Sequence, residues 1–242
     1  MEDQSKLIEK LGRILETYTP SPEAIELVQK TSIILLVGIA GAGKDTIKHH
    51  LLETDKYHHI VSHTTRSPRT NNGVMEQDGV EYHFVSREDM LIMIERGDFI
   101  EAKMYSNNIY GTSVDEIRAA HNTHRTAITD IEVQGVAEYK ALSNKVFAVF
   151  ILPPSYEVWM HRLLSRYNGQ PEPSDLRRRM ETAVDELEHA LGSDYFTFII
   201  NDDLETTVKD IDKHTESDSA TDGENEPKAL ARELLFAIKA KL

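Results

Sequence analysis

The most constraining feature of the sequence is a glycine-rich turn that follows a short apolar run. Residues 33–37 (IILLV) lead directly into residues 38–46 (GIAGAGKDT), and a helical pattern comes next. The spacing G-x-x-x-x-G-K is that of a P-loop, in which glycines let backbone N–H groups turn inward around an anion. The N-terminus of the following helix adds partial positive charge, and Lys44 would reach the β- and γ-phosphates of a nucleotide.

The loop departs from the usual pattern at one position. A Ser or Thr that approaches magnesium normally follows the lysine, but Asp45 stands there and Thr46 comes next. A glycine-rich turn without a ligand is the competing interpretation, and the strand before the turn and the helix after it count against it. The predicted ATP-binding residues of the loop are Gly38, Ile39, Ala40, Gly41, Ala42, Gly43, Lys44, Asp45 and Thr46.

Further apolar runs predict an α/β fold. They lie at residues 126–131, 146–152 and 196–200, and helical patterns separate them. Strands that alternate with helices are typical of a parallel sheet covered on both faces. Residues 62–112 break this rhythm, with short strand-like pieces and one helix near residues 87–96, so we expect a small subdomain inserted into the core.

Composition excludes several classes of protein. The chain has 41 acidic and 27 basic residues, a formal net charge of −14 that argues against nucleic-acid and anionic-membrane binding. Residues 201–226 alone carry ten acids and two bases, so much of the excess lies in one segment. The absence of cysteine excludes disulfides, cysteine-ligated metals and thiol nucleophiles. The N-terminal residues do not form a signal peptide, so we expect a cytoplasmic protein.

Residues 62–69 (SHTTRSPR) offer a second phosphate site. Arg66 and Arg69 are three residues apart around a proline, and the planar guanidinium gives bidentate hydrogen bonds to phosphate. Such a pair alone is usually a solvated surface feature. Its neighbours change this interpretation, because residues 76–82 (EQDGVEY), 99–101 (FIE), 110–112 (YGT) and 130–135 (DIEVQG) follow in order.

In this order the segments resemble the guanylate kinase family, from about Ser32 to Leu204. The resemblance implies a P-loop three-layer α/β/α core with a parallel sheet, an inserted mixed α+β GMP-binding subdomain and a helical lid. It implies the transferase reaction ATP + GMP = ADP + GDP, with Mg²⁺ accompanying ATP. Two alternatives stay open: a catalytically weak or inactive binding module, which the intact P-loop disfavours and only Asp45 keeps open, and a kinase for another phosphorylated small molecule.

The resemblance also assigns residue roles in the acceptor site. Arginines and tyrosines match the groups that hold the GMP phosphate, and Glu76 matches the acid that orients those arginines. Glu101 matches the carboxylate that accepts from guanine N1 and N2, and Thr112 matches the residue that reads O6. The implied GMP-binding residues are Ser62, Arg66, Arg69, Glu76, Tyr82, Glu101, Tyr110, Thr112, Asp130 and Glu132.

A lid at about residues 162–180 completes the implied site. Arg162 and Arg166 are four residues apart and so lie on one helical face, and Arg179 follows a polar, proline-rich loop. Asn201 matches a residue near the adenine, and Thr46 with Asp130 would hold Mg²⁺ through water. The implied catalytic residues are Lys44, Arg66, Asp130, Arg162, Arg166 and Arg179.

We expect four segments along the chain. Residues 1–30 form a helical extension, and residues 31–204 form the kinase-like domain, with core segments 31–61 and 113–204 around the insert 62–112. Residues 205–226 are an acidic, partly disordered linker, and residues 227–242 form a last helix. We expect the terminal helices to pack on the core or on each other, in a monomer or a homodimer whose partners are ATP and GMP.

Overall fold

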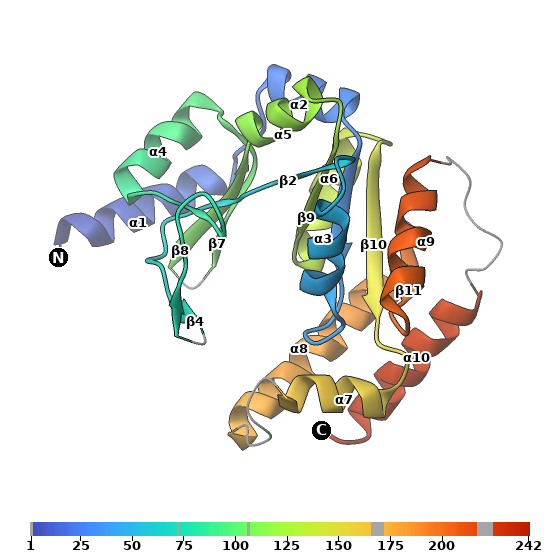
Figure 1. The fold of residues 1–242 in the computed structure, drawn as a ribbon. Helices are drawn as coiled ribbons and strands as arrows, with labels where there is room; N and C mark the ends of the chain where they lie inside the picture. Colours follow the sequence, from blue (N-terminus) through green and yellow to red (C-terminus); the bar gives the residue numbers. More distant parts are fainter. Residues whose placement is uncertain (1, 72, 106, 166–171, 217–224) are drawn as a thin grey trace. The chain divides into compact units, whose positions relative to one another are not determined.

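The computed structural model describes residues 2–71, 73–105, 107–165, 172–216 and 225–242 (Figure 1). The chain divides into two compact units. The first unit comprises Met1–Thr31 and His58–Ala127, and the second comprises Ser32–Tyr57 and Ile128–Leu242.

The main sheet has five strands in the order β11-β10-β1-β9-β2. Strand β1 pairs in parallel with β10, from Ile33 opposite Val146 to Val37 opposite Phe150, and β10 pairs in parallel with β11. All five residues of β1 are buried, as expected for a parallel strand covered on both faces. The predicted α/β fold is confirmed. The strands are β1 (Ile33–Val37), β2 (Tyr57–His59), β9 (Thr126–Asp130), β10 (Val146–Leu152) and β11 (Phe196–Ile200).

Helices pack against this sheet. Helix α3 contacts β1 and α9, α9 contacts β10 and β11, and α6 contacts β10. The C-terminal helix α10 packs along α8 and also touches β11, which fits the prediction that it packs on the core. The helices are α3 (Lys44–Leu52), the 3₁₀ turn η1 (Val133–Gly135), α6 (Val136–Leu142), α7 (Tyr156–Ser165), α8 (Pro173–Leu191), α9 (Leu204–Glu216) and α10 (Asn225–Lys239).

The first unit is built on a four-stranded sheet with the order β6-β3-β8-β7 and a separate hairpin, β4-β5. It extends beyond the predicted insert because α5 packs against α2, and α1 packs against α4 and β7. Its elements are α1 (Glu2–Leu15), α2 (Pro22–Lys30), β3 (His63–Thr64), β4 (Thr70–Asn71), β5 (Val74–Met75), β6 (His83–Phe84), α4 (Arg87–Arg96), β7 (Phe99–Tyr105), β8 (Asn108–Ser113) and α5 (Val114–Asn122).

The N-terminal extension supplies part of the first unit's core. Leu11 of α1 is fully buried in a cluster with Met90 and Ile94 of α4 and with Phe99 of β7. The apolar residues of α1 recur at helical spacing, which forms one stripe that faces this cluster. Among the described residues, the N-terminal helix therefore packs against α4 and β7, which lie in the predicted insert 62–112, and not against the core segments or the C-terminal helix as predicted.

The prediction of an acidic linker over residues 205–226 is wrong for its first part. Leu204–Glu216 is a helix, α9, in which Thr207 and Ile211 are buried. The Asp203 carboxylate accepts from the Thr206 N–H at 2.9 Å and so caps the helix start. Apolar residues at helical spacing outweigh the acidic composition, because burial against the sheet stabilises the helix. Residues 217–224 lie outside the described part of the chain.

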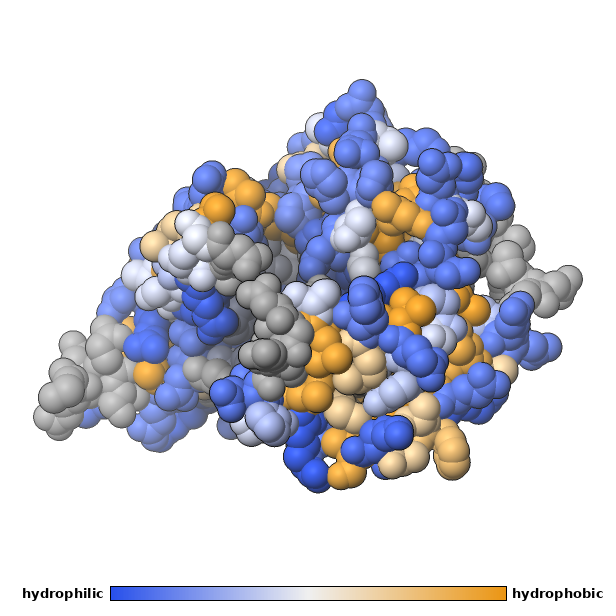
Figure 2. All heavy atoms as spheres, turned by 60° about the horizontal axis from the view of Figure 1, so that its bottom comes forward, coloured by the Kyte–Doolittle hydropathy of each residue, from blue (hydrophilic) through white to orange (hydrophobic). Residues whose placement is uncertain are grey.

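The surface mixes apolar and polar side chains. Figure 2 shows a face on which hydrophobic patches are separated by hydrophilic residues. Within the described ranges, none of the helices combines the length and apolarity that a bilayer-spanning segment needs.

Candidate active site

The P-loop is shaped by glycines that no other residue can replace without strain. Gly38 has a φ of 139° and Gly43 a φ of 102°, both in the region that L-residues avoid. A Cβ at Gly38 would clash with the Ile151 carbonyl oxygen, and one at Gly43 would clash with Asn201 Nδ2. The loop between β1 and α3 is therefore tightly packed. Its backbone N–H groups can line a binding site for an anion.

Two side chains from distant segments hold this loop. Trp159 Nε1 of α7 donates to the Ala40 carbonyl oxygen at 2.8 Å, and Asn201 Nδ2 donates to the Ala42 carbonyl oxygen at 2.8 Å. Trp159 is fully buried and is the only tryptophan of the chain. The role of Trp159 was not predicted, because its partner lies more than a hundred positions earlier and no local pattern links the two.

Lysines of α3 organise the charges around the loop. Lys44 Nζ donates to the carbonyl oxygens of Gly38 and Ile39, and Lys48 Nζ forms an ion pair with the Asp130 carboxylate. Burial raises the pKa of Asp130, but the charges of Lys48 and Lys44 outweigh it and hold that pKa below its usual value. Asp130 is therefore ionised at neutral pH.

Glu186 of α8 is a further acid that sequence reasoning missed. Burial raises its pKa to about 7, the Lys44 charge opposes this, and Glu132 and Asp185 add to it. Helix α8 packs against η1, which directly follows Glu132. Nothing in the sequence marks Glu186, since its burial and its charged neighbours come from the tertiary structure.

A pocket of about 350 Å³ adjoins the loop. Arg162 Nη2 donates to the Asn201 carbonyl oxygen at 3.1 Å, while its buried Nη1 has no hydrogen-bond partner in the described part of the chain. Arg179 lies on α8, and Arg166 falls outside the described residues. Asp45 is exposed. The pocket lining comprises Gly41, Gly43, Thr46, Arg162, Asn201, Asp202 and Leu204.

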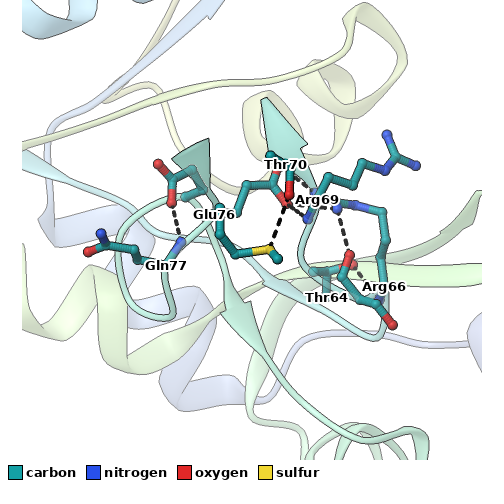
Figure 3. A network of polar contacts seen from close by, with 9 residues as sticks. Thr64, Arg66, Arg69, Thr70, Glu76 and Gln77 are labelled. Carbon is teal, nitrogen blue, oxygen red and sulfur yellow. Dashed lines mark hydrogen bonds and ion pairs between the residues drawn. The ribbon is translucent and has the colours of Figure 1, made fainter. Parts of the chain in front are cut away.

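Within the first unit, Arg66 and Glu76 form a buried ion pair. Both side chains are 8% exposed, and two guanidinium nitrogens meet the two carboxylate oxygens at 2.8 and 3.1 Å. Glu76 also accepts from the Arg69 backbone N–H at 2.8 Å, so it fixes both arginines (Figure 3). The hydrogen bonds that Arg66 donates to the Glu76 carboxylate hold the pKa of Arg66 above its usual value. In Figure 3 the guanidinium of Arg69 points away from this network.

Aromatic rings surround the same arginine. The Arg66 guanidinium carbon lies 5.2 Å from the centroid of the Tyr82 ring and 5.8 Å from that of Phe84. The rings of Tyr82 and Tyr110 are 5.9 Å apart. The structure thus brings Arg66, Tyr82 and Tyr110 together, while the Ser62 carbonyl oxygen accepts from the backbone of β6 at 2.9 Å.

Strands β7 and β8 bring Glu101 and Thr112 together. They are opposite each other in the antiparallel register, and Glu101 Oε1 accepts from the Thr112 backbone N–H at 3.1 Å. Gly111, between Tyr110 and Thr112, permits the close approach of β8 to the Phe99 ring of β7, because a Cβ at Gly111 would lie only 2.8 Å from that ring. Tyr110 and Thr112 are two residues apart on one strand and therefore point to the same face.

The donor groups near the P-loop suit magnesium. Mg²⁺ usually keeps several waters and is bound by one or two carboxylates together with substrate phosphates. Asp130 supplies an ionised carboxylate and Thr46 a hydroxyl at the pocket lining. Among the described residues, no group of three or more His, Cys, Asp or Glu side chains could hold a metal by itself.

The parallel sheet, the strained glycine loop and the helix that starts at Lys44 define a P-loop nucleotide-binding protein of the α/β class. The guanylate kinase family model matches residues 29–218, which is more than half of the chain. The chain belongs to the guanylate kinase family, and the resemblance found in the sequence is confirmed.

Relatives and a solved structure support this assignment. The guanylate kinase of Schizosaccharomyces pombe is 36% identical over 186 residues, covering 76% of this chain and 89% of that protein. The guanylate kinase of Alkalilimnicola ehrlichii is 38% identical over 173 residues, covering 71% and 81%. The crystal structure of guanylate kinase from Anaplasma phagocytophilum matches with a TM-score of 0.57 and 24% identity, covering 87% and 97%, and supports the fold.

Proposed function

We propose that the protein transfers the γ-phosphoryl group of ATP to GMP and releases ADP and GDP. The observation that carries this proposal is the face of strand β8. Tyr110 lies beside the Arg66 cluster, and Thr112, two residues further, lies beside Glu101. Groups for a phosphate and groups for a base edge therefore project from one strand. The names of the relatives, guanylate kinases with similar sequences, support the same reaction.

Guanine fits this pair of residues. Its N1–H and N2–H groups would donate to the Glu101 carboxylate, and its O6 would accept from the Thr112 hydroxyl. Adenine presents the opposite pattern and would leave the carboxylate unpaired. A site built on hydrogen bonds rejects the wrong ligand strongly for this reason.

The acceptor phosphate would lie against the cationic cluster. Arg66 is held rigidly by Glu76, so little side-chain entropy remains to be lost on binding. Arg69 supplies a second guanidinium, and the Tyr82 and Tyr110 hydroxyls with Ser62 would complete the phosphate contacts. Asp130 and Glu132 are the remaining acceptor-site residues of the proposal.

The donor phosphates would occupy the P-loop. Lys44 would exchange its carbonyl partners for phosphate oxygens, and the buried Nη1 of Arg162 would gain an anionic partner. Arg166 and Arg179 complete the proposed lid, and Asn201 borders the adenine. Phosphoryl transfer depends mainly on positioning and on stabilisation of the developing charge, which these cations provide.

Magnesium is the proposed companion of ATP. Thr46 and Asp130 would hold it through water, and when bound it neutralises charge on the donor phosphates. ATP and GMP are the proposed partners of a cytoplasmic monomer or homodimer that engages neither nucleic acid nor a membrane.

A coupled assay with ATP and Mg²⁺ tests the proposal. We expect turnover of GMP far above that of AMP, CMP or UMP. Equal turnover of the four nucleotides would contradict the guanine specificity. Calorimetry with ATP and Mg²⁺ separates the enzyme from a binding module, since a chain that binds GMP but no ATP would be such a module.

A further inference from the structure

The N-terminal helices lie largely outside residues 29–218, the range of the family match, and yet they contact the strand that carries Glu101. Helix α1 packs against β7 and α4, and α2 also contacts β7. Leu11 of α1 and Phe99 of β7 share one buried cluster. The extension is therefore part of the structure around the guanine-reading pair.

One side chain of the extension bonds directly to the backbone of β7. The Tyr18 hydroxyl donates to the Phe99 carbonyl oxygen at 2.7 Å and accepts from the Phe99 N–H at 3.1 Å. Both backbone polar groups of this fully buried residue thus meet one hydroxyl. Buried backbone groups require partners, so Tyr18 stabilises this particular backbone conformation.

This contact lies at an irregularity of the strand. Phe99 is opposite Ser113 and Glu101 is opposite Thr112, so two steps on β7 match one step on β8 and Ile100 is the extra residue of a bulge. Bulges redirect the side chains that follow them. Here the next paired residue after the bulge is Glu101.

The turn before the bulge is also covered by the extension. Gly97 has a φ of 75°, and a Cβ there would lie 3.3 Å from Cβ of Ser21, the N-cap residue of α2. Burial raises the pKa of Tyr18, its bond to the Phe99 backbone opposes this, and the charges of Asp98 and Glu101 raise that pKa further. The contact of α2 with Gly97 and the bond of Tyr18 to Phe99 therefore both hold the segment that leads into the bulge.

We propose that Tyr18 is a positioning residue for guanine recognition, which holds the β7 bulge so that the Glu101 carboxylate faces the base. This inference rests on the proposed GMP site. Tyr18 has no contact with the nucleotide in this proposal and acts through the backbone of Phe99.

The test compares Tyr18→Phe with Tyr105→Phe as a matched control. Tyr105 is on the same strand and is 62% exposed. GMP and IMP binding is measured by calorimetry and steady-state kinetics, because IMP lacks the 2-amino group that Glu101 would read. For Tyr18→Phe we expect about 10-fold weaker GMP binding, which corresponds to the loss of one good hydrogen bond between Glu101 and the guanine. IMP keeps the N1–H donor and lacks only the 2-amino group, so its binding should weaken less than that of GMP. The KM for ATP should stay unchanged, and Tyr105→Phe should resemble the wild type.

A double-variant cycle with Glu101→Gln identifies the route of the effect. If Tyr18 acts through Glu101, introducing Tyr18→Phe into the wild-type protein changes the preference for GMP over IMP. Introducing it into the Glu101→Gln variant leaves that preference unchanged. Equal weakening of GMP and IMP would indicate a merely structural role and overturn the proposal, as would unchanged GMP binding. Thermal melting shows that each variant is folded. A wild-type protein without GMP turnover would contradict the proposed enzyme, whereas the binding comparison still decides the role of Tyr18.

Discussion

At the scale of single residues, the Arg66–Glu76 pair is the most consequential contact of the acceptor site. The pair is buried and bidentate, so removing one charge leaves the other desolvated without compensation. Glu76 also fixes the backbone at Arg69. The arginines are therefore held in place before a ligand binds.

We predict that Glu76→Gln destabilises the fold by about 3 kcal/mol, the usual cost of breaking a buried ion pair. GMP binding should weaken by about 10-fold or more because Arg66 loses its orientation. Urea unfolding and GMP titration measure the two effects. The control is Glu95→Gln, which breaks an exposed pair with Lys10 and should change stability by about 0.5 kcal/mol at most. Similar losses in both variants would contradict the prediction.

A second prediction concerns Gly43. In Gly43→Ala the new Cβ meets the Asn201 amide and the residue keeps an unfavourable φ of 102°. Gly73→Ala is the matched control, since Gly73 has a φ of 81° but a Cβ there would meet no atom within 4 Å. We expect both variants to lose about 1 kcal/mol through backbone strain. Only Gly43→Ala should lose ATP affinity as well, which calorimetry measures.

At the scale of elements, α1 belongs to the first unit's core. We predict that Leu11→Ala lowers the free energy of unfolding by about 2–4 kcal/mol, because a fully buried leucine leaves a cavity. Ile92→Ala on α4, where the side chain is 45% exposed, serves as the control and should lower it by less than about 1 kcal/mol. Chemical denaturation compares the two. A negligible effect of Leu11→Ala would mean that α1 does not stabilise the unit.

The small sheet contains a histidine that makes stability depend on pH. Burial and the neighbouring charge of His83 lower the pKa of His63 to about 4, while Glu116 partly opposes them. The rings of His63 and His83 are 4.5 Å apart, and His83 Nε2 lies 3.0 Å from Glu116 Oε1. His63 is therefore neutral in the folded protein at pH values at which the unfolded chain is protonated.

The pKa of His63 in the folded protein lies below the unfolded value of 6.5. The stability that the neutral, buried His63 contributes is therefore fully present above pH 6.5 and is lost as pH falls toward 4. We predict that His63→Gln reduces the loss of stability over this range by about 1–3 kcal/mol. Urea unfolding at pH 7 and pH 4.5 tests it, with His161→Gln, at an exposed position of α7, as control. An unchanged pH dependence in His63→Gln would contradict the assignment.

At the scale of the whole molecule, charge is distributed unevenly. Residues 201–226 carry a net −8 of the total −14, and part of that segment is helix α9. The proposed phosphate groups instead meet Lys44 and Arg162 in one unit and Arg66 and Arg69 in the other. Local cationic clusters bind anions even when the net charge is negative.

If ATP and GMP bind at two separately built sites, each ligand should stabilise the folded protein independently of the other. A ligand at 100 times its Kd stabilises the folded state by about 2.7 kcal/mol. Thermal melting should therefore show stabilisation by ATP with Mg²⁺ and by GMP in the wild type. Gly43→Ala should lose most of the ATP effect and keep the GMP effect, and Glu76→Gln should do the reverse. Loss of both effects in either variant would contradict two separately built sites.

The sequence by itself was sufficient to predict the P-loop, the parallel α/β core and the family. These features depend on short runs such as residues 33–46, in which an apolar strand is followed directly by the glycine and lysine spacing of a P-loop. Helix α9 does not follow from the composition, because the acidic residues of this segment mask the apolar spacing of Leu204 and Ile211.

Only the tertiary structure reveals which distant groups complete the sites. Trp159 meets Ala40, Tyr18 meets Phe99, and Glu186 becomes buried near Lys44. In each case the partners are far apart in the sequence, and the side chain that completes the contact (Trp159, Tyr18 or Glu186) lies outside the motifs. Motifs record the chemistry that a short segment must supply, whereas burial, hydrogen-bond partners and pKa depend on packing between segments.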